Sequence, residues 1–170
     1  FKKIWEVTYW DKKFNGVENY KQPLILKFKH ILASELKSMW VKEGDIKLLS
    51  TGKFDGYTTS EFAEEFINEG EIVAIPSGGS ANIKYYNGKF VDSGNILCCT
   101  RDQKLLNLKY FYYFLLDNNK TIDILFRGTS VKHPNMPEIL EISIPIPPLE
   151  VQEEIVGILD NFTALEAELE

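Results

Sequence analysis

Cysteine and histidine are scarce in this sequence, which has two of each among its 170 residues. Cys98 and Cys99 are adjacent in a strand-like run, and neighbours on a strand point to opposite faces, so a bridge between them would be strained. His30 and His133 stand alone, with no further His or Cys at ligand spacing. We therefore expect no metal site and two reduced thiols in a cytoplasmic protein.

Long apolar runs are missing as well. The longest covers only residues 110–116, whereas a helix that crosses a bilayer needs about 20 apolar residues. No signal peptide is visible. The sequence opens at Phe1 and stops at Glu170 inside a helical pattern. We expect an excised fragment of a longer chain, with no membrane segment of its own.

Basic residues are fewer than acidic ones: the sequence has 19 Lys and Arg against 25 Asp and Glu, which gives a net charge of −6. Nucleic-acid-binding domains are usually basic, so this total argues against that class. The deficit is local, since residues 138–170 contain nine acids and no Lys or Arg. The other 16 acids and 19 bases give residues 1–137 a net charge of +3. A mildly basic body carries an acidic tail, and the charge no longer excludes a nucleic-acid partner.

Patterns of catalytic residues are also absent. Glu35-Leu36-Lys37 matches half of a metal-dependent nuclease motif, but no Pro-Asp partner precedes it, and an exposed charge pair on a helix explains it as well. Ser77 and Ser80 have no His–Asp relay close in sequence. No P-loop, dinucleotide-binding glycine pattern or metalloprotease helix occurs. We expect neither catalytic residues nor a cofactor in this chain.

The apolar content is sufficient for a real core, with 44% hydrophobic and 13% aromatic residues. Alternating and helical apolar patterns both occur, which predicts a mixed α/β globular domain over residues 1–146. Strands are expected at residues 1–10, 24–28, 45–50, 71–75, 95–100 and 142–146. Helices are expected at residues 31–40, 58–70 and 107–116. The second helix would begin with a capping box from Thr58 to Glu61, and Asn107 would cap the third. Asn87-Gly88 suits a type I′ turn and predicts a hairpin over residues 83–91.

A helical pattern begins after Pro147-Pro148, and proline is favourable at the start of a helix. Residues 147–170 then carry apolar side chains at spacings of 4, 3, 4, 3 and 4, namely Val151, Ile155, Ile158, Phe162, Leu165 and Leu169. This heptad spacing is typical of a coiled-coil seam and is narrower than the stripe of a helix on a globular core. We expect the helix to pair with another helix; the alternative is a terminal helix folded onto its own domain.

Two polar loops have the composition of a binding surface. Ser77-Gly78-Gly79-Ser80 offers small residues, free amides and hydroxyls that suit close approach to a phosphate. In the second loop, Arg can bind guanine edges, and Lys and His can contact phosphate. Its candidate contact residues are Arg127, Thr129, Ser130, Lys132 and His133, and Lys53, Tyr57, Lys84 and Tyr85 are further candidates nearby. Ordinary exposed connections fit the same spacing equally well.

The stretch from Ile144 to Asp160 contains Ile-Pro-Ile-Pro-Pro-Leu-Glu-Val-Gln followed by Ile-Val-Gly-Ile-Leu-Asp. It resembles a boundary in the specificity subunits of Type I restriction–modification enzymes, where a strand ending in Ile-Pro-x-Pro-Pro-Leu-x-x-Gln enters a long helix. The Gly-Thr-Ser loop at 128–130, the Pro-Ser-Gly-Gly-Ser turn and the aromatic helix at 108–116 also resemble the family's target-recognition domain. The resemblance covers essentially the whole chain and is strongest over residues 122–162.

The resemblance implies a non-enzymatic subunit with two recognition domains held apart by helices, each binding half of an interrupted double-stranded DNA site. It also implies assembly with methyltransferase and restriction subunits, on which S-adenosylmethionine, ATP and Mg²⁺ are expected. This chain has one such domain and one helix start. It is therefore expected to be half of a subunit, or to form a homodimer through the helix. The alternative is a protein–protein adaptor with the same fold and no DNA contact.

Overall fold

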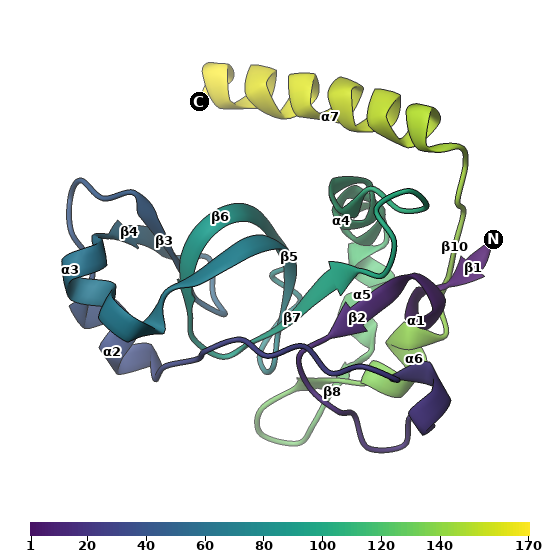
Figure 1. The fold of residues 1–170 in the computed structure, drawn as a ribbon, viewed down its shortest axis with the longest axis horizontal. Coiled ribbons are helices and arrows are strands. Elements are labelled where there is room, and N and C mark those ends of the chain that lie inside the picture. Colours follow the sequence, from purple (N-terminus) through teal and green to yellow (C-terminus); the bar gives the residue numbers. More distant parts are fainter.

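The computed structural model describes residues 1–170, and its centre is a six-stranded sheet with the order β2-β7-β5-β6-β3-β4. The strands are β2 (Thr8–Trp10), β3 (Ile46–Leu49), β4 (Asp55–Thr58), β5 (Asn68–Pro76), β6 (Lys84–Asp92) and β7 (Asn95–Thr100). Neighbouring strands are antiparallel, except that β3 and β6 run parallel. Together with the helices around it (Figure 1), this sheet confirms the predicted mixed α/β fold.

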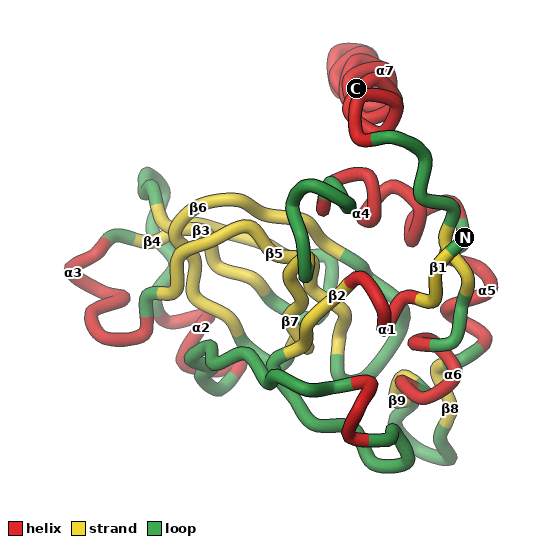
Figure 2. The backbone as a smooth tube through the Cα atoms, turned by 45° about the vertical axis from the view of Figure 1, so that its right-hand side comes forward, coloured by secondary structure: helices red, strands yellow, loops and turns green.

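Helices cover both ends of the sheet, as Figures 1 and 2 show. Near β2 and β7 lie α4 (Leu108–Asp117), α5 (Asn119–Ile124) and α6 (Met136–Leu140), and near β3 and β4 lie α2 (Ala33–Ser38) and α3 (Ser60–Ala63). Smaller elements are α1 (Ile4–Val7), the 3-10 turns η1 (Asn19–Lys21) and η2 (Glu64–Phe66), and the two-stranded pairs β1 (Lys2–Lys3) with β10 (Ser143–Ile144) and β8 (Phe126–Arg127) with β9 (His133–Pro134). The long α7 (Leu149–Leu169) runs along the side opposite the β8–β9 loop.

The main core lies between α4, α5, α6 and the β2–β7–β5 part of the sheet. It is a cluster of 22 buried residues that includes Trp10, Val73, Cys98, Phe111 and Ile139. Burial of one large apolar side chain stabilises a fold by about 1.5–3 kcal/mol. Of two smaller clusters of five buried residues each, one packs α2 and α3 against β3 and β6, and the other extends across β3, β5, β6 and β7. The sheet is therefore a rigid platform from which loops at the strand ends project.

Many predicted elements are confirmed by the structure. The helix α2 and the strands β3, β5, β7 and β10 fall where they were expected. Asn107 caps α4, because its side-chain oxygen accepts a hydrogen bond from the Tyr110 backbone N–H at 3.0 Å. The helix α7 follows Pro147-Pro148, and Cys98 and Cys99 are both free thiols.

The predicted hairpin over residues 83–91 is wrong. Strand β6 continues through Asn87-Gly88 and stays paired with β5 along its length. In that register Gly88 lies opposite Gly70, and their φ angles are +146° and +153°. Only glycine adopts such backbone angles readily. The glycine therefore allows a locally distorted, continuous ladder instead of a turn, and the hairpin turn lies earlier, between β5 and β6.

The predicted strand over residues 1–10 is correct only at its two ends. Between β1 and β2 the chain forms α1, because Ile4 and Val7 are spaced to share one buried helical face. The expected strand at 24–28 is also wrong. That segment makes only one isolated bridge, from Ile25 to β2, so it runs beside the sheet without joining it.

The predicted capping box is wrong as well. Thr58 is the last residue of β4, where it pairs with Ile46, and its buried hydroxyl has no hydrogen-bond partner. The cap of α3 is Thr59, which makes no side-chain capping bond. Strand pairing with β3 has overridden the local helix-start signal. The helix is also shorter than expected, and the Phe62 side chain on it is 53% exposed.

Candidate nucleic-acid interface

The two polar loops singled out in the sequence meet at one edge of the molecule. The Gly79 backbone N–H donates to the Lys132 carbonyl oxygen at 2.8 Å. The His133 Nδ1 lies 2.7 Å from the Ser77 carbonyl oxygen, and because a carbonyl can only accept, Nδ1 carries the hydrogen and donates it. The β5–β6 loop and the β8–β9 loop therefore form one continuous surface, on the side opposite α7 in Figure 1.

Glycine is required for this close approach. A Cβ on Gly128 would overlap the Val131 carbonyl oxygen, and one on Gly78 would lie 3.3 Å from the Val131 side chain. Gly79 has a φ of +91°, in the left-handed region that other residues rarely adopt. Gly128 thus allows the β8–β9 loop to close on itself, and Gly78 allows the β5–β6 loop to approach it closely.

The β3–β4 loop joins the same edge. The Asn82 side chain donates to the Thr51 carbonyl oxygen at 3.2 Å, which links this loop to the β5–β6 loop. Lys53 is exposed in the β3–β4 loop. Tyr57 differs, because it lies within strand β4, where the Lys47 ammonium sits 4.8 Å from its ring centroid. The structure therefore places Lys53 with the loops and Tyr57 on the sheet.

Lys84 and Tyr85 have partners inside the protein. The Lys84 ammonium is 2.7 Å from Asp55 Oδ1 and donates to the Ser50 carbonyl oxygen at 2.6 Å, and only 13% of the side chain is exposed. The Tyr85 hydroxyl donates to the Glu71 carboxylate, and burial together with this carboxylate raises the pKa of the phenol. Both side chains hold neighbouring strands together.

The remaining candidates are exposed on the β8–β9 hairpin. Arg127 forms an ion pair with Glu138, with its guanidinium nitrogen 3.0 Å from the carboxylate. Thr129, Ser130 and Lys132 point into solvent without hydrogen bonds from their side chains, so their polar groups are free to meet a ligand. This segment therefore carries two cations, Arg127, whose charge is partly neutralised by Glu138, and Lys132, which forms no ion pair.

His30 links two segments next to this edge through its side chain. Its isolation in the sequence did not indicate this structural role. Its ring nitrogens lie 2.8 Å from an Asp11 oxygen and 2.7 Å from an Asp92 oxygen, and both carboxylates are buried. The hydrogen bonds to Asp11 and then Asp92 raise the pKa of His30 to about 10. At neutral pH the ring is therefore a cation, and it ties the segment after β2 to the end of β6.

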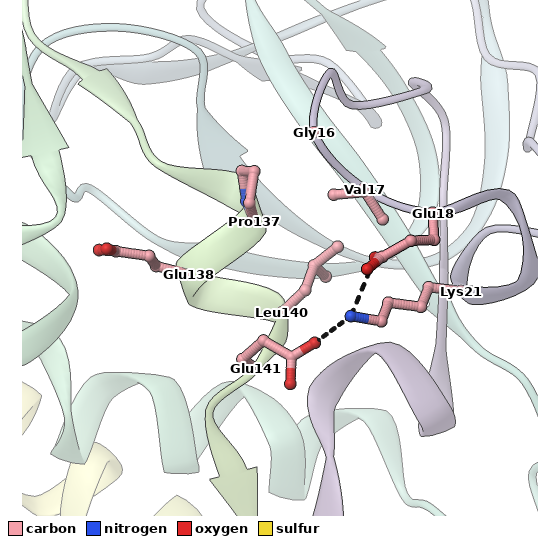
Figure 3. Close-up of a pocket in the computed structure, with 8 residues that line it drawn as sticks. All are labelled: Gly16, Val17, Glu18, Lys21, Pro137, Glu138, Leu140 and Glu141. Carbon is pink, nitrogen blue, oxygen red and sulfur yellow. Dashed lines mark hydrogen bonds and ion pairs between the residues drawn. The ribbon is translucent and has the colours of Figure 1, made fainter.

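A separate hollow between η1 and α6 is acidic and is not part of this edge. Figure 3 shows Lys21 between Glu18 and Glu141, whose oxygens lie 3.0 Å and 2.5 Å from its ammonium. Glu138 also lines the hollow, but its carboxylate pairs with Arg127, and the Lys3 ammonium lies 3.6 Å from the Glu141 carboxylate. The carboxylates of this hollow are therefore all paired with cations.

The start of α7 is fixed to the domain by a buried glutamine. The Gln152 side chain accepts a hydrogen bond from the Asn107 N–H at 2.8 Å and donates to the carbonyl oxygens of Leu105 and Pro147 at 2.8 Å and 2.9 Å. Three turns into the helix, Asp160 pairs with Lys109 at 2.9 Å. The helix is therefore anchored to the N-terminal end of α4.

Beyond these contacts α7 runs along one side of the domain, as Figure 1 shows. Ile155 packs against the main core, but most of the predicted seam does not: Val151, Ile158, Phe162, Leu165 and Leu169 are exposed, with Phe162 at 59% and Leu169 at 89%. An apolar stripe of this kind on a surface marks an interaction site. The helix is thus not folded onto its own domain beyond its first turns.

The structure contains no group of three or more His, Cys, Asp or Glu side chains placed to hold a metal ion. None of its helices combines the length and apolar character that crossing a membrane requires. The molecule thus combines a rigid sheet, polar loops at one edge and an exposed heptad seam on the opposite side.

The chain belongs to the Type I restriction modification DNA specificity domain family, whose model matches residues 31–170. It is 32% identical, over 168 residues, to the Haemophilus influenzae protein S.HindORF215P, named for a type I restriction enzyme specificity subunit. That alignment covers 95% of this chain and 42% of the relative. The specificity subunit of the MjaVIII enzyme from Methanocaldococcus jannaschii is 27% identical over 128 residues, which cover 72% of this chain and 30% of that protein.

Solved structures show the same fold. The S subunit of the Type I restriction–modification system of M. genitalium matches with a TM-score of 0.66 at 19% identity, covering 96% of this chain and 38% of that one. The chain therefore spans less than half the length of these relatives.

Proposed function

We propose that this chain is the half of a specificity subunit that binds one half of a bipartite double-stranded DNA target in a Type I restriction–modification complex. It would select the sequence and leave catalysis to partner subunits. Membership of the specificity domain family carries this proposal. The meeting of polar loops at one edge, through Gly79 and Lys132, supports it.

The contact surface of this proposal is the edge formed by the three loops. It would include Lys53, Ser77, Gly78, Gly79, Ser80, Arg127, Thr129, Ser130, Lys132 and His133. Backbone amides and Lys would fix the position by contacting phosphates, while Arg and the hydroxyls would contact base edges in the major groove. Tyr57, Lys84 and Tyr85 are better suited to supporting the sheet, because each already interacts with a neighbouring side chain.

Residues 1–146 would form the DNA-binding unit, and residues 147–170 the start of a spacer helix. The exposed seam from Val151 to Leu169 would pair with the second recognition half or with a second copy of the chain. Methyltransferase and restriction subunits would complete the assembly in the cytoplasm and would bind S-adenosylmethionine, ATP and Mg²⁺. The 21 residues of α7 span about 30 Å, so the helix would set the distance between half-sites.

The test is a gel shift of the complete subunit, together with its cognate methyltransferase, against a pool of random duplexes. We expect enrichment of an interrupted sequence and loss of binding when Lys53, Ser80 and Lys132 are all changed to Ala. The matched control is Lys104→Ala, an exposed lysine outside the loop edge. Methyltransferase binding without any DNA binding would instead support the adaptor function.

A second experiment tests the helix as a spacer. Insertion of seven residues into α7 adds two turns and preserves the heptad register. We expect the gap between the two recognised half-sequences to change while the half-sequences stay the same. Changed half-sequences with an unchanged gap would contradict the spacer role.

A further inference from the structure

Three adjoining hollows form a furrow along the loop edge, and Ser77 lines all of them. The first, about 270 Å³, lies between residues 12–15 and residues 133–137. The second, about 250 Å³, shares Lys12 with the first and continues to Gly94. The third, about 570 Å³, extends past Gly79 to Val131. The furrow is open and elongated, whereas the pocket of a small ligand would be enclosed.

The exposed charges of this furrow are all positive. Its one carboxylate, Asp11, is only 3% exposed and is paired with the His30 cation. Lys12 is exposed and forms no ion pair, and Lys13 beside it donates to the Val17 carbonyl oxygen at 2.5 Å. Lys12 is therefore the free cation of the furrow, on a segment that the loop-based sequence prediction did not include.

The backbone that carries Lys12 is held rigidly. The Gln22 side chain, itself 7% exposed, donates to the Lys12 carbonyl oxygen at 2.8 Å and accepts from the Phe14 N–H at 2.9 Å. The Phe14 ring is buried and packs edge-on against Trp10, with centroids 5.9 Å apart. A fixed backbone lowers the entropy that a contact loses on binding. The ammonium thus extends from a preorganised position beside Ser77.

We propose that this furrow receives the sugar–phosphate backbone of one DNA strand, with Lys12 as its principal charged contact. The inference rests on the proposed function and adds residues 11–15 to the interface. Lysine is a compact point charge that suits phosphate and does not provide the planar fork that reads a base. The small residues Ser77, Gly78 and Gly94 let a backbone approach closely along the floor. Contact at the furrow therefore adds affinity that does not depend on sequence.

The experiment measures the dissociation constant of the complete subunit with its methyltransferase on its own target duplex, over a series of salt concentrations. Each neutralised phosphate contributes about 0.9 to the slope of log affinity against log salt. We expect Lys12→Gln to reduce the slope by about 0.9 and to weaken binding roughly three- to tenfold. The recognised sequence should not change, and Lys12→Arg should retain the wild-type slope.

The matched control is Lys104→Gln, which removes an exposed lysine next to the start of α4, outside the furrow. If Lys12→Gln and Lys104→Gln leave the slope and affinity equally unchanged, the furrow is not a phosphate site. A change of recognised sequence in Lys12→Gln would also overturn the inference, because it would make Lys12 a base contact. If the wild-type assembly fails to bind DNA, the proposed function itself fails.

Discussion

Replacement of Gln152 by Ala removes the only buried polar side chain of α7. Its amide links three backbone groups, those of Leu105, Asn107 and Pro147, at the junction between α4 and α7. All three groups would lose a partner at once. The substitution therefore tests how much this single side chain contributes to the stability of the α4–α7 junction.

The expected loss follows from the count of hydrogen bonds. Each typical intramolecular hydrogen bond stabilises by about 1 kcal/mol net, and buried groups left without a partner cost somewhat more. Three such bonds give a loss of about 3–4 kcal/mol in the free energy of unfolding. For a chain of this size, 1 kcal/mol shifts the Tm by about 2–4 °C. We expect Gln152→Ala to lower the Tm by about 6–16 °C.

Urea unfolding and calorimetry measure this loss, and Gln103→Ala is the matched control, because Gln103 is exposed. That control should stay within about 0.5 kcal/mol of the wild type. The variant Gln152→Glu keeps the shape and one acceptor but places a buried carboxylate against the carbonyl oxygens of Leu105 and Pro147, so we expect a loss at least as large as that of Gln152→Ala. A loss below about 1 kcal/mol for Gln152→Ala would show that the three Gln152 hydrogen bonds do not stabilise the α4–α7 junction.

Three further predictions concern the loop edge and the helix. His30→Gln should lower the free energy of unfolding by about 1–2 kcal/mol, a figure reduced because the His30 side chain is 36% exposed and solvent screens its charge. Because the pKa of His30 is raised to about 10, this stabilisation is complete below about pH 6.5 and is lost as the pH rises towards 10. The calorimetric Tm difference from the wild type should narrow over that range, and a constant difference would contradict the charge role. Gly128→Ala should weaken DNA binding at least about tenfold in a gel shift, because its Cβ would overlap the Val131 carbonyl oxygen. The control Gly157→Ala, in open space on α7, should leave binding unchanged. Equal binding by both variants would contradict a role for the shape of the β8–β9 loop in DNA binding. Phe162→Glu should abolish self-association, or pairing with the second recognition half, in analytical ultracentrifugation. The Tm of the unpaired chain should stay the same, since the Phe162 side chain is exposed. Unchanged association would contradict the role of the α7 seam in helix pairing.

The elements that could be predicted from the sequence are those specified by local patterns. The cap Asn107, the aromatic face of α4 and the heptad spacing of α7 depend on residues three or four apart. The glycine-containing loops were also visible, because small and polar residues interrupt the apolar strands around them. Their composition identified each loop, although it did not indicate that the loops touch.

The parts that could not be predicted depend on residues far apart in the chain. His30 is 19 residues from Asp11 and 62 from Asp92, so no spacing motif connects these side chains. The Asn87-Gly88 pair resembles a turn until β5 is known to lie along it with its own glycine opposite. Lys84 resembled a surface cation because Asp55, its partner, comes from another strand. In each case tertiary pairing decided between two locally plausible states.

The central claim is that the loop edge selects the DNA sequence. The test is methylome sequencing of cells that carry the intact gene, compared with cells in which Arg127, Lys132, Ser77 and Ser80 are all changed to Ala. Methylation of the half-site that this domain is proposed to bind should be lost or should shift to another sequence. Methylation of the same motif to the same extent would contradict it.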